Sequence, residues 1–196
     1  WRVPTSQLGS ETQALLLKKE GPGRLYYHLR LDYALAGMEQ GPLQAGMALW
    51  RTFQGLDDPQ DAIEVSPNRW RFAEGARLKC IVRIEVYARR CDQVMLEVPI
   101  PAGTEFIDQR LAVSDAPRPA AEEECCCLPY GWGFERQNLR AHQVEAFSWS
   151  LCSSQEYVFY LRATAPGEYI LPPAQAHAMY APELRGRSAS GRVVVE

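Results

Sequence analysis

Short segments in which apolar and polar side chains alternate with a period of two are the feature that most constrains this fold. The clearest of them are residues 79–88, 94–100, 143–151 and 157–163. A period of two places alternate side chains on opposite faces of a β-strand, so each segment predicts a strand with one apolar face. Such faces must be covered by a second sheet. The sequence therefore predicts an all-β chain with an antiparallel β-sandwich.

Turn residues predict how these strands are joined. Residues 89–92 separate the first two strands and predict an antiparallel hairpin. The last strand is followed by Pro166-Gly167, a turn from which a second strand, 168–171, is expected to return. Pro172 and Pro173 end that strand, because proline has no N–H to donate to a ladder. Further predictions are strands at 47–53 and 192–196, a polar loop at 56–68, and at most one turn of helix at 174–180.

The N-terminal part predicts a second, incomplete β domain. Gly21-Pro22-Gly23 lies between apolar runs at 14–18 and 25–33, which predicts a hairpin. These few strands cannot bury a core alone. We therefore expect them to complete a domain whose other half lies upstream, or to pack on a neighbouring chain.

A linker predicts the domain boundary. Residues 36–46 contain three glycines and a proline with little apolar periodicity. We therefore divide the chain into residues 1–45 and residues 46–196. Since it opens on Trp1 in a polar stretch, we expect it to belong to a longer polypeptide.

Composition excludes several classes of protein. With 46% apolar and 23% charged residues, the 196-residue chain is typical of globular proteins. The net charge of −3 and the lack of a Lys/Arg cluster give no reason to expect a nucleic-acid partner. No apolar run approaches the roughly 20 residues of a membrane helix.

The six cysteines match no known zinc or redox spacing. Cys80 falls on the inward side of a predicted strand and is expected to be a small buried residue. A disulfide between the Cys125, Cys126 and Cys127 triplet and Cys152 is one arrangement that an oxidising compartment allows. The alternative is a metal site built from the triplet and Glu122–Glu124, which lacks a His at ligand spacing.

No enzyme template fits the chain. It has no Gly-x-Ser-x-Gly motif and no phosphate-binding glycine loop, and its three His residues stand far from any nucleophile in sequence. The remaining catalytic alternative is a cluster of His142, Glu145 and Cys152 in space. We expect no enzymatic activity, no cofactor and no metal ion.

Several short motifs follow one another in a characteristic order. A Gly-x-Gly-x-x-Tyr-Tyr hairpin and an Asn-Leu-Arg segment precede an Arg-Ala strand, a Pro-Gly turn, a double proline and a Met-Tyr-x-Pro-Glu segment. Their residues include Asn138, Leu139, Arg140, Arg162, Pro166, Gly167, Met179, Tyr180 and Pro182. The order resembles the C-terminal part of the bacterial-type alpha-2-macroglobulins, and the resemblance implies structural roles for these residues.

The chain departs from the family at two points. Where the family has an acidic pair after Asn-Leu-Arg, this chain has Ala141-His142, so the charge contact of those acids is lost or replaced. The family's thioester motif is Cys-x-Glu-Gln, but Glu39-Gln40 follow Gly37-Met38 here, and no thioester is expected within these residues.

The resemblance implies a role for each domain. Residues 1–45 would supply the C-terminal strands of a CUB-like domain, and residues 46–196 the last macroglobulin-like sandwich of a non-enzymatic, protease-trapping inhibitor. That sandwich would pack against the thioester domain and shield it. The implied partners are the thioester and upstream macroglobulin-like domains of the same polypeptide, together with target proteases. The implied location is extracellular, cell-surface or periplasmic.

Two other functions stay open. One is a cell-surface or extracellular structural or adhesion module that lacks inhibitor activity. The other is a carbohydrate-binding sandwich with an aromatic platform, for which the candidates are Trp50, Tyr130, Trp132 and Trp149.

Overall fold

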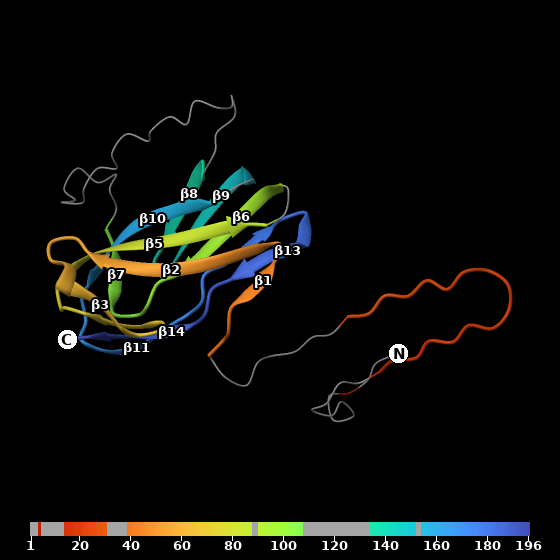
Figure 1. Cartoon of the computed structure of the whole chain (residues 1–196), viewed down its shortest axis with the longest axis horizontal. Coiled ribbons are helices and arrows are strands. Elements are labelled where there is room, and N and C mark those ends of the chain that lie inside the picture. The colour runs from red at the N-terminus through yellow and green to blue at the C-terminus, as the bar shows by residue number, and fades with distance from the viewer. Residues whose placement is uncertain (1–3, 5–13, 31–38, 88–89, 108–133, 152–153) are drawn as a thin grey trace. The chain divides into compact units, whose positions relative to one another are not determined.

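The computed structural model describes residues 4, 14–30, 39–87, 90–107, 134–151 and 154–196 (Figure 1). The chain divides into two units, Trp1–Leu35 and Ala36–Glu196. This division precedes the predicted boundary at 45/46, because a strand at Leu43–Ala45 pairs within the second unit. No helix among the described residues is long and apolar enough to span a membrane.

The second unit is all-β, as predicted, and its described residues form three sheets. The six-stranded sheet has the order β1-β13-β12-β6-β9-β8, the β5 sheet the order β2-β5-β10-β7, and the β14 sheet the order β11-β14-β4-β3. The strands are β1 Leu43–Ala45, β2 Met47–Gly55, β3 Ala62–Ser66, β4 Arg69–Phe72, β5 Arg77–Val86, β6 Cys91–Pro99, β7 Thr104–Phe106, β8 Arg136–Arg140, β9 Gln143–Leu151, β10 Gln155–Ala163, β11 Gly167–Leu171, β12 Gln175–Ala178, β13 Ala181–Arg187 and β14 Gly191–Val195.

The sheets enclose one apolar core. In Figure 1 the β5 sheet lies in front of β6, β8 and β9, and β3, β11 and β14 lie at the lower end of the unit. The alternating residues of β5 and β6 fill the core, as the sequence predicts: Leu78, Cys80, Val82, Ile84, Val94, Leu96 and Val98 are fully buried. Phe53 joins the β5 and β14 sheets, since its ring centroid lies 5.2 Å from that of Trp70 and 5.0 Å from that of Phe72.

Two predicted hairpins are wrong, although their strands are correct. Strand β5 pairs with β2 and β10, whereas β6 pairs with β9 and β12 in the other sheet. Strand β11 pairs with β14 and not with β10. The reason is that both edges of β5 are occupied, and β10 has β5 on one side and β7 on the other. The chain must therefore cross to another sheet after each of these strands.

Two smaller segments differ in detail from the sequence analysis. Residues 174–180 contain β12 and no helical turn, within the predicted limit of one turn, because Gln175–Ala178 fill the gap between β6 and β13. The predicted loop at 56–68 contains a short 3₁₀ turn, Pro59–Asp61, and the edge strand β3, which pairs with β4. Local polarity conceals an edge strand of this kind, since only its buried first residue, Ala62, faces the core.

The hairpin predicted near the N-terminus is not formed in residues 14–30. The bend at 21–23 is present, with Gly21 at φ 92° and Gly23 at φ 100°, and Lys19 Nζ donates to the carbonyl of Pro22 at 2.8 Å. No strand accompanies it in these residues, whereas 31–33 lie outside the described part. An isolated two-stranded hairpin is marginal in water. The apolar side chains here are exposed: Leu15, Leu16, Leu17, Leu25, Tyr26, Tyr27 and Leu29.

Candidate functional site

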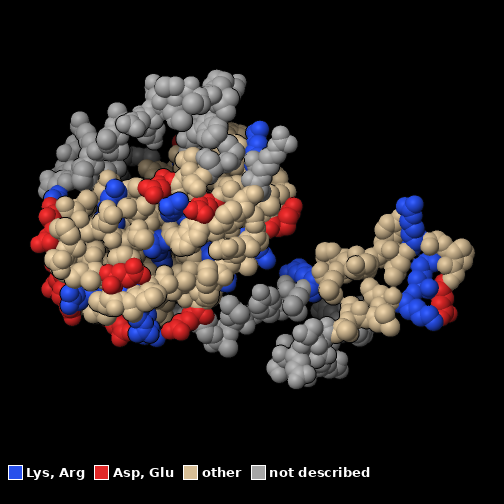
Figure 2. Space-filling view, in the orientation of Figure 1, with Lys and Arg blue, Asp and Glu red and all other residues tan. Residues whose placement is uncertain are grey.

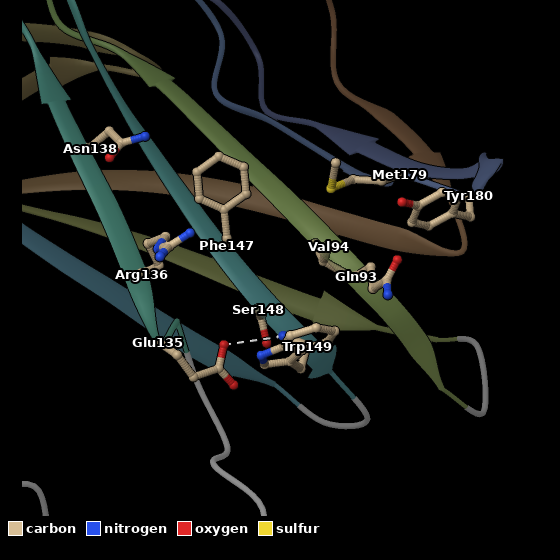
Figure 3. A pocket seen from close by; sticks show the side chains of 10 residues that line it. All are labelled: Gln93, Val94, Glu135, Arg136, Asn138, Phe147, Ser148, Trp149, Met179 and Tyr180. Carbon is tan, nitrogen blue, oxygen red and sulfur yellow. Dashed lines mark hydrogen bonds between the residues drawn. The ribbon is translucent and has the colours of Figure 1, made fainter.

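An open groove of about 580 Å³ lies on the six-stranded sheet (Figure 3). The turn between β12 and β13 forms one side, and β8 and β9 form the other. Its walls are lined by Gln93, Val94, Glu135, Arg136, Asn138, Phe147, Ser148, Trp149, Met179 and Tyr180. Three of these, Asn138, Met179 and Tyr180, are motif residues from the sequence, and the fold brings them to one place.

Large apolar side chains around the groove face solvent. The exposed fraction is 81% for Tyr180, 70% for Trp149 and 49% for Met179. Phe147 and Trp149 lie on the face of β9 opposite to its core residues Val144 and Ala146. A cluster of exposed aromatic residues and a methionine is typical of a surface that another protein covers.

Backbone irregularities coincide with the groove. Gln93 is the third residue of β6 and has φ 52°, a left-handed conformation that is uncommon for residues other than glycine. Its carbonyl accepts a hydrogen bond from the Met179 N–H at 2.9 Å. Across the sheet, the Trp149 N–H donates to the Glu135 carboxylate at 3.1 Å (Figure 3).

The β8–β9 hairpin carries a charge contact next to the Asn-Leu-Arg segment, where the sequence analysis expects the contact of an acidic pair to be lost or replaced. The carboxylate of Glu145 is buried and accepts hydrogen bonds from Arg140 Nε at 2.6 Å and Gln143 Nε2 at 2.9 Å. The Arg140 bond is the main reason that the pKa of Glu145 is lowered. In this chain Glu145 thus partners Arg140, and Ala141-His142 form the turn between the two strands.

The remaining motif residues lie outside the groove lining. Pro166 and Gly167 lead from β10 into β11, where the Tyr169 hydroxyl donates to the carbonyls of Ala165 and Pro166, each at 3.2 Å. Arg162 is an exposed residue of β10. Pro182 lies in β13 next to the β12–β13 turn, and Leu139 lies in β8. The structural roles expected for these residues stay predictions.

The structure supports none of the other candidate sites among the residues that it describes. Cys125–Cys127, Cys152, Tyr130 and Trp132 lie outside the described residues, so the disulfide, the metal alternative and the His142 cluster stay predictions. Trp50 and Trp149 lie on strands of different sheets and do not form one platform. Cys80 is fully buried, and burial raises the pKa of its thiol to about 12, which keeps it unreactive.

The surface charges are mixed. On the face shown in Figure 2, Lys and Arg side chains are interspersed with Asp and Glu side chains over the described part of the second unit. Within the described residues, no group of three or more His, Cys, Asp or Glu side chains is placed to hold a metal ion. The groove is therefore the strongest candidate for a functional surface.

Comparison with known proteins gives the family. Residues 46–183 match the model of the bacterial alpha-2-macroglobulin MG10 domain. The chain belongs to the bacterial alpha-2-macroglobulin family, whose members are non-enzymatic protease inhibitors. It is 26% identical to an alpha-2-macroglobulin homolog of Nostoc sp., over 99% of this chain and 10% of that protein. A protein of Dictyostelium discoideum named circularly permutated Ras protein 2 is 24% identical over 97% of this chain and 4% of its own length.

Solved structures agree on the fold. Salmonella alpha-2-macroglobulin reacted with methylamine has a TM-score of 0.58 at 20% identity, covering 80% of this chain and 10% of that one. Escherichia coli alpha-2-macroglobulin activated by porcine elastase has a TM-score of 0.63 at 18% identity, covering 80% of this chain and 14% of that one. The chain thus spans about a tenth, or less, of the length of the curated relatives it matches.

Proposed function

We propose that this chain is the C-terminal region of a protease-trapping inhibitor and acts by docking, without chemistry of its own. Its docking surface is the groove, and the exposed Met179–Tyr180 turn, here called the docking tip, is the main contact. The partner is the thioester domain of the same polypeptide, which the docked sandwich shields. The single observation that carries this proposal is the exposure of Tyr180, Trp149 and Met179 around one groove of a domain that spans a tenth of its relatives.

The energetics favour a covered surface. Burying an aromatic side chain at an interface removes roughly 150–250 Å² of surface from water, and such residues dominate binding energies. Two aromatic side chains and a methionine left in water would not help the isolated domain to fold. Their apolar surface is stabilised only when a partner covers it.

The exposed apolar residues of 14–30 also support the proposal that the chain is part of a longer polypeptide. They have no sheet to pack on among the described residues, and we propose that they complete a CUB-like domain of the longer polypeptide. The proposed location is extracellular, cell-surface or periplasmic, where an inhibitor meets its target proteases. The mixed surface charge gives no support for a nucleic-acid partner.

The alternative is a structural or adhesion module without inhibitor activity. The Dictyostelium relative favours it, since its name describes no inhibitor although it matches almost the whole of this chain. The two functions differ in a trapping assay on the intact polypeptide with elastase. A trap blocks cleavage of large protein substrates while small peptide substrates are still hydrolysed, whereas a structural module changes neither.

The docking itself is tested by calorimetric titration. The part of the polypeptide upstream of Trp1, expressed separately, is titrated into the 196-residue chain. Replacing both Met179→Ser and Tyr180→Ser should weaken binding at least about tenfold, because central aromatic contacts carry more than 1.4 kcal/mol. Trp50→Ser, at an exposed position of the β5 sheet, is the matched control and should bind normally. Equal binding by the double variant would refute the docking surface.

A further inference from the structure

The docking tip is built on a turn that a regular hairpin does not favour. Ala178 lies opposite Ala181, so Met179 and Tyr180 alone close the connection between β12 and β13. Two-residue hairpin turns favour left-handed residues, usually Asn or Gly, because these match the twist of the strands. Met179 and Tyr180 both lie outside the left-handed region. The hairpin therefore needs support from outside the turn.

The ladder beyond the turn is also interrupted. The next register pair after Ala178–Ala181 is His177–Arg185, which leaves residues 182–184 of β13 without a counterpart in β12. Pro182 within this bulge has no N–H to donate. The β12–β13 pair on its own thus fixes the tip poorly, and the tip carries two exposed apolar side chains.

The support comes from the neighbouring strand β6. Its ladder with β12 ends at the pair Val94–Ala178, and the next register position sets Gln93 opposite Met179. There the Gln93 carbonyl accepts the Met179 N–H at 2.9 Å, so the ladder extends by one rung into the turn. Gln93 adopts φ 52° at this point, and the pair Gln93–Trp149 is missing from the β6–β9 register between Asp92–Ser150 and Val94–Ser148.

We propose that Gln93 is a positioning residue, whose left-handed backbone near the start of β6 directs its carbonyl to the Met179 amide and so fixes the docking tip. A left-handed residue other than glycine is unfavourable, and such residues cluster where the surrounding structure imposes a functional geometry. Gln93 is one of two such non-glycine residues in the described chain, the other being Asn68 at φ 59° in the turn between β3 and β4. Only Gln93 lines the groove. The inference deepens the proposed docking function and rests on it.

Two substitutions at Gln93 separate backbone positioning from side-chain contact. Gln93→Gly keeps the carbonyl and removes the left-handed strain, so the thermal midpoint should rise by about 2–4 °C. The Met179 amide should stay protected from hydrogen exchange, because the carbonyl that accepts its hydrogen bond is retained. Gln93→Val favours an extended backbone. It should lower the midpoint, speed exchange at Met179 by up to about tenfold, the value of one hydrogen bond, and weaken binding.

Asn68→Val is the matched control in the same 196-residue chain. It places the same unfavourable residue at the same left-handed conformation, away from the groove, and should lower the midpoint while Met179 exchange and binding stay unchanged. The positioning role is overturned if Gln93→Val leaves Met179 exchange unchanged, or if Asn68→Val accelerates it equally. If exchange at Met179 rises in Gln93→Val while binding stays intact, the positioning of the tip stands and its role in docking is refuted.

Discussion

A buried arginine ties three separate parts of the sandwich together, and its replacement tests how the core is held. Arg51 on β2 is only 8% exposed. Its Nη1 donates to the carbonyl of Pro99 at 2.8 Å and its Nη2 to the carbonyl of Pro172 at 2.5 Å, while Nε has no hydrogen-bond partner. The guanidinium also lies 5.8 Å from the Phe53 ring centroid. The Pro99 carbonyl lies at the end of β6, and the Pro172 carbonyl directly follows β11.

The energies of burial and hydrogen bonding indicate that Arg51→Lys, although chemically conservative, destabilises the fold more than Arg51→Met does. Burial lowers the pKa of Arg51 from its ordinary value to about 10, which corresponds to about 3 kcal/mol of unfavourable desolvation. Two charged hydrogen bonds of about 1.5–3 kcal/mol each offset it. Arg51→Lys keeps the buried charge but reaches one carbonyl at most, so we expect the free energy of unfolding to fall by about 2–4 kcal/mol. Arg51→Met removes the charge and retains the packing, so its loss should be smaller, about 1 kcal/mol.

Urea unfolding followed by far-ultraviolet circular dichroism measures both values, provided that the slope with denaturant stays constant. Arg71→Lys is the control, because the Arg71 side chain is 48% exposed and its change should stay within about 0.5 kcal/mol. A lysine variant as stable as the parent chain would refute the tie between the two carbonyls. A methionine variant less stable than the lysine variant would refute the desolvation cost of the buried charge.

Two further predictions concern thiols and acid. Cys80 and Cys91 are fully buried, and desolvation raises the pKa of both thiols. They should therefore react with a thiol reagent only after unfolding, so that at most four of the six cysteines react in the native chain. Reaction of Cys80 or Cys91 in the native protein, mapped by mass spectrometry, would contradict this. The lowered pKa of Glu145 gives a stabilising contribution that is present above about pH 4.3, the unfolded value, and lost as pH falls through the folded value. The urea midpoints of the parent and Glu145→Gln should therefore differ most at pH 7 and converge as the pH falls below the folded value. A difference that does not change with pH would show that the Arg140 contact is not the cause.

The period-two pattern identifies strands well but not their partners. Strands β5, β6, β9 and β10 lie where alternation predicts them, since period two reports which side chains face a core. Pairing depends on which sheet edges are already occupied, and that is set by contacts far apart in sequence. The crossing between β5 and β6 is an example: a short connection suggests a hairpin, yet β2 and β10 occupy both edges of β5.

The candidate site was predictable in part. Met179 and Tyr180 stand out in the sequence through their family motif. Trp149 shares its face of the alternating strand with Phe147 and Leu151, so the pattern alone does not show that it faces solvent. Gln93 carries no signal, because nothing in its neighbourhood suggests a left-handed residue inside a strand. The groove itself arises only when β6, β9 and the β12–β13 turn are placed side by side, which requires the registers of the six-stranded sheet.

Photo-crosslinking from the docking tip tests the central claim most directly. p-Benzoylphenylalanine is incorporated in place of Tyr180 in the intact polypeptide, with a second preparation labelled in place of Trp50 as the control. After irradiation and peptide mapping, we expect the label at 180 to be joined to the thioester domain of the same chain, and the label at 50 not to be. Crosslinks from position 180 to no upstream segment, or equal crosslinking from both positions, would contradict a docking role for this face.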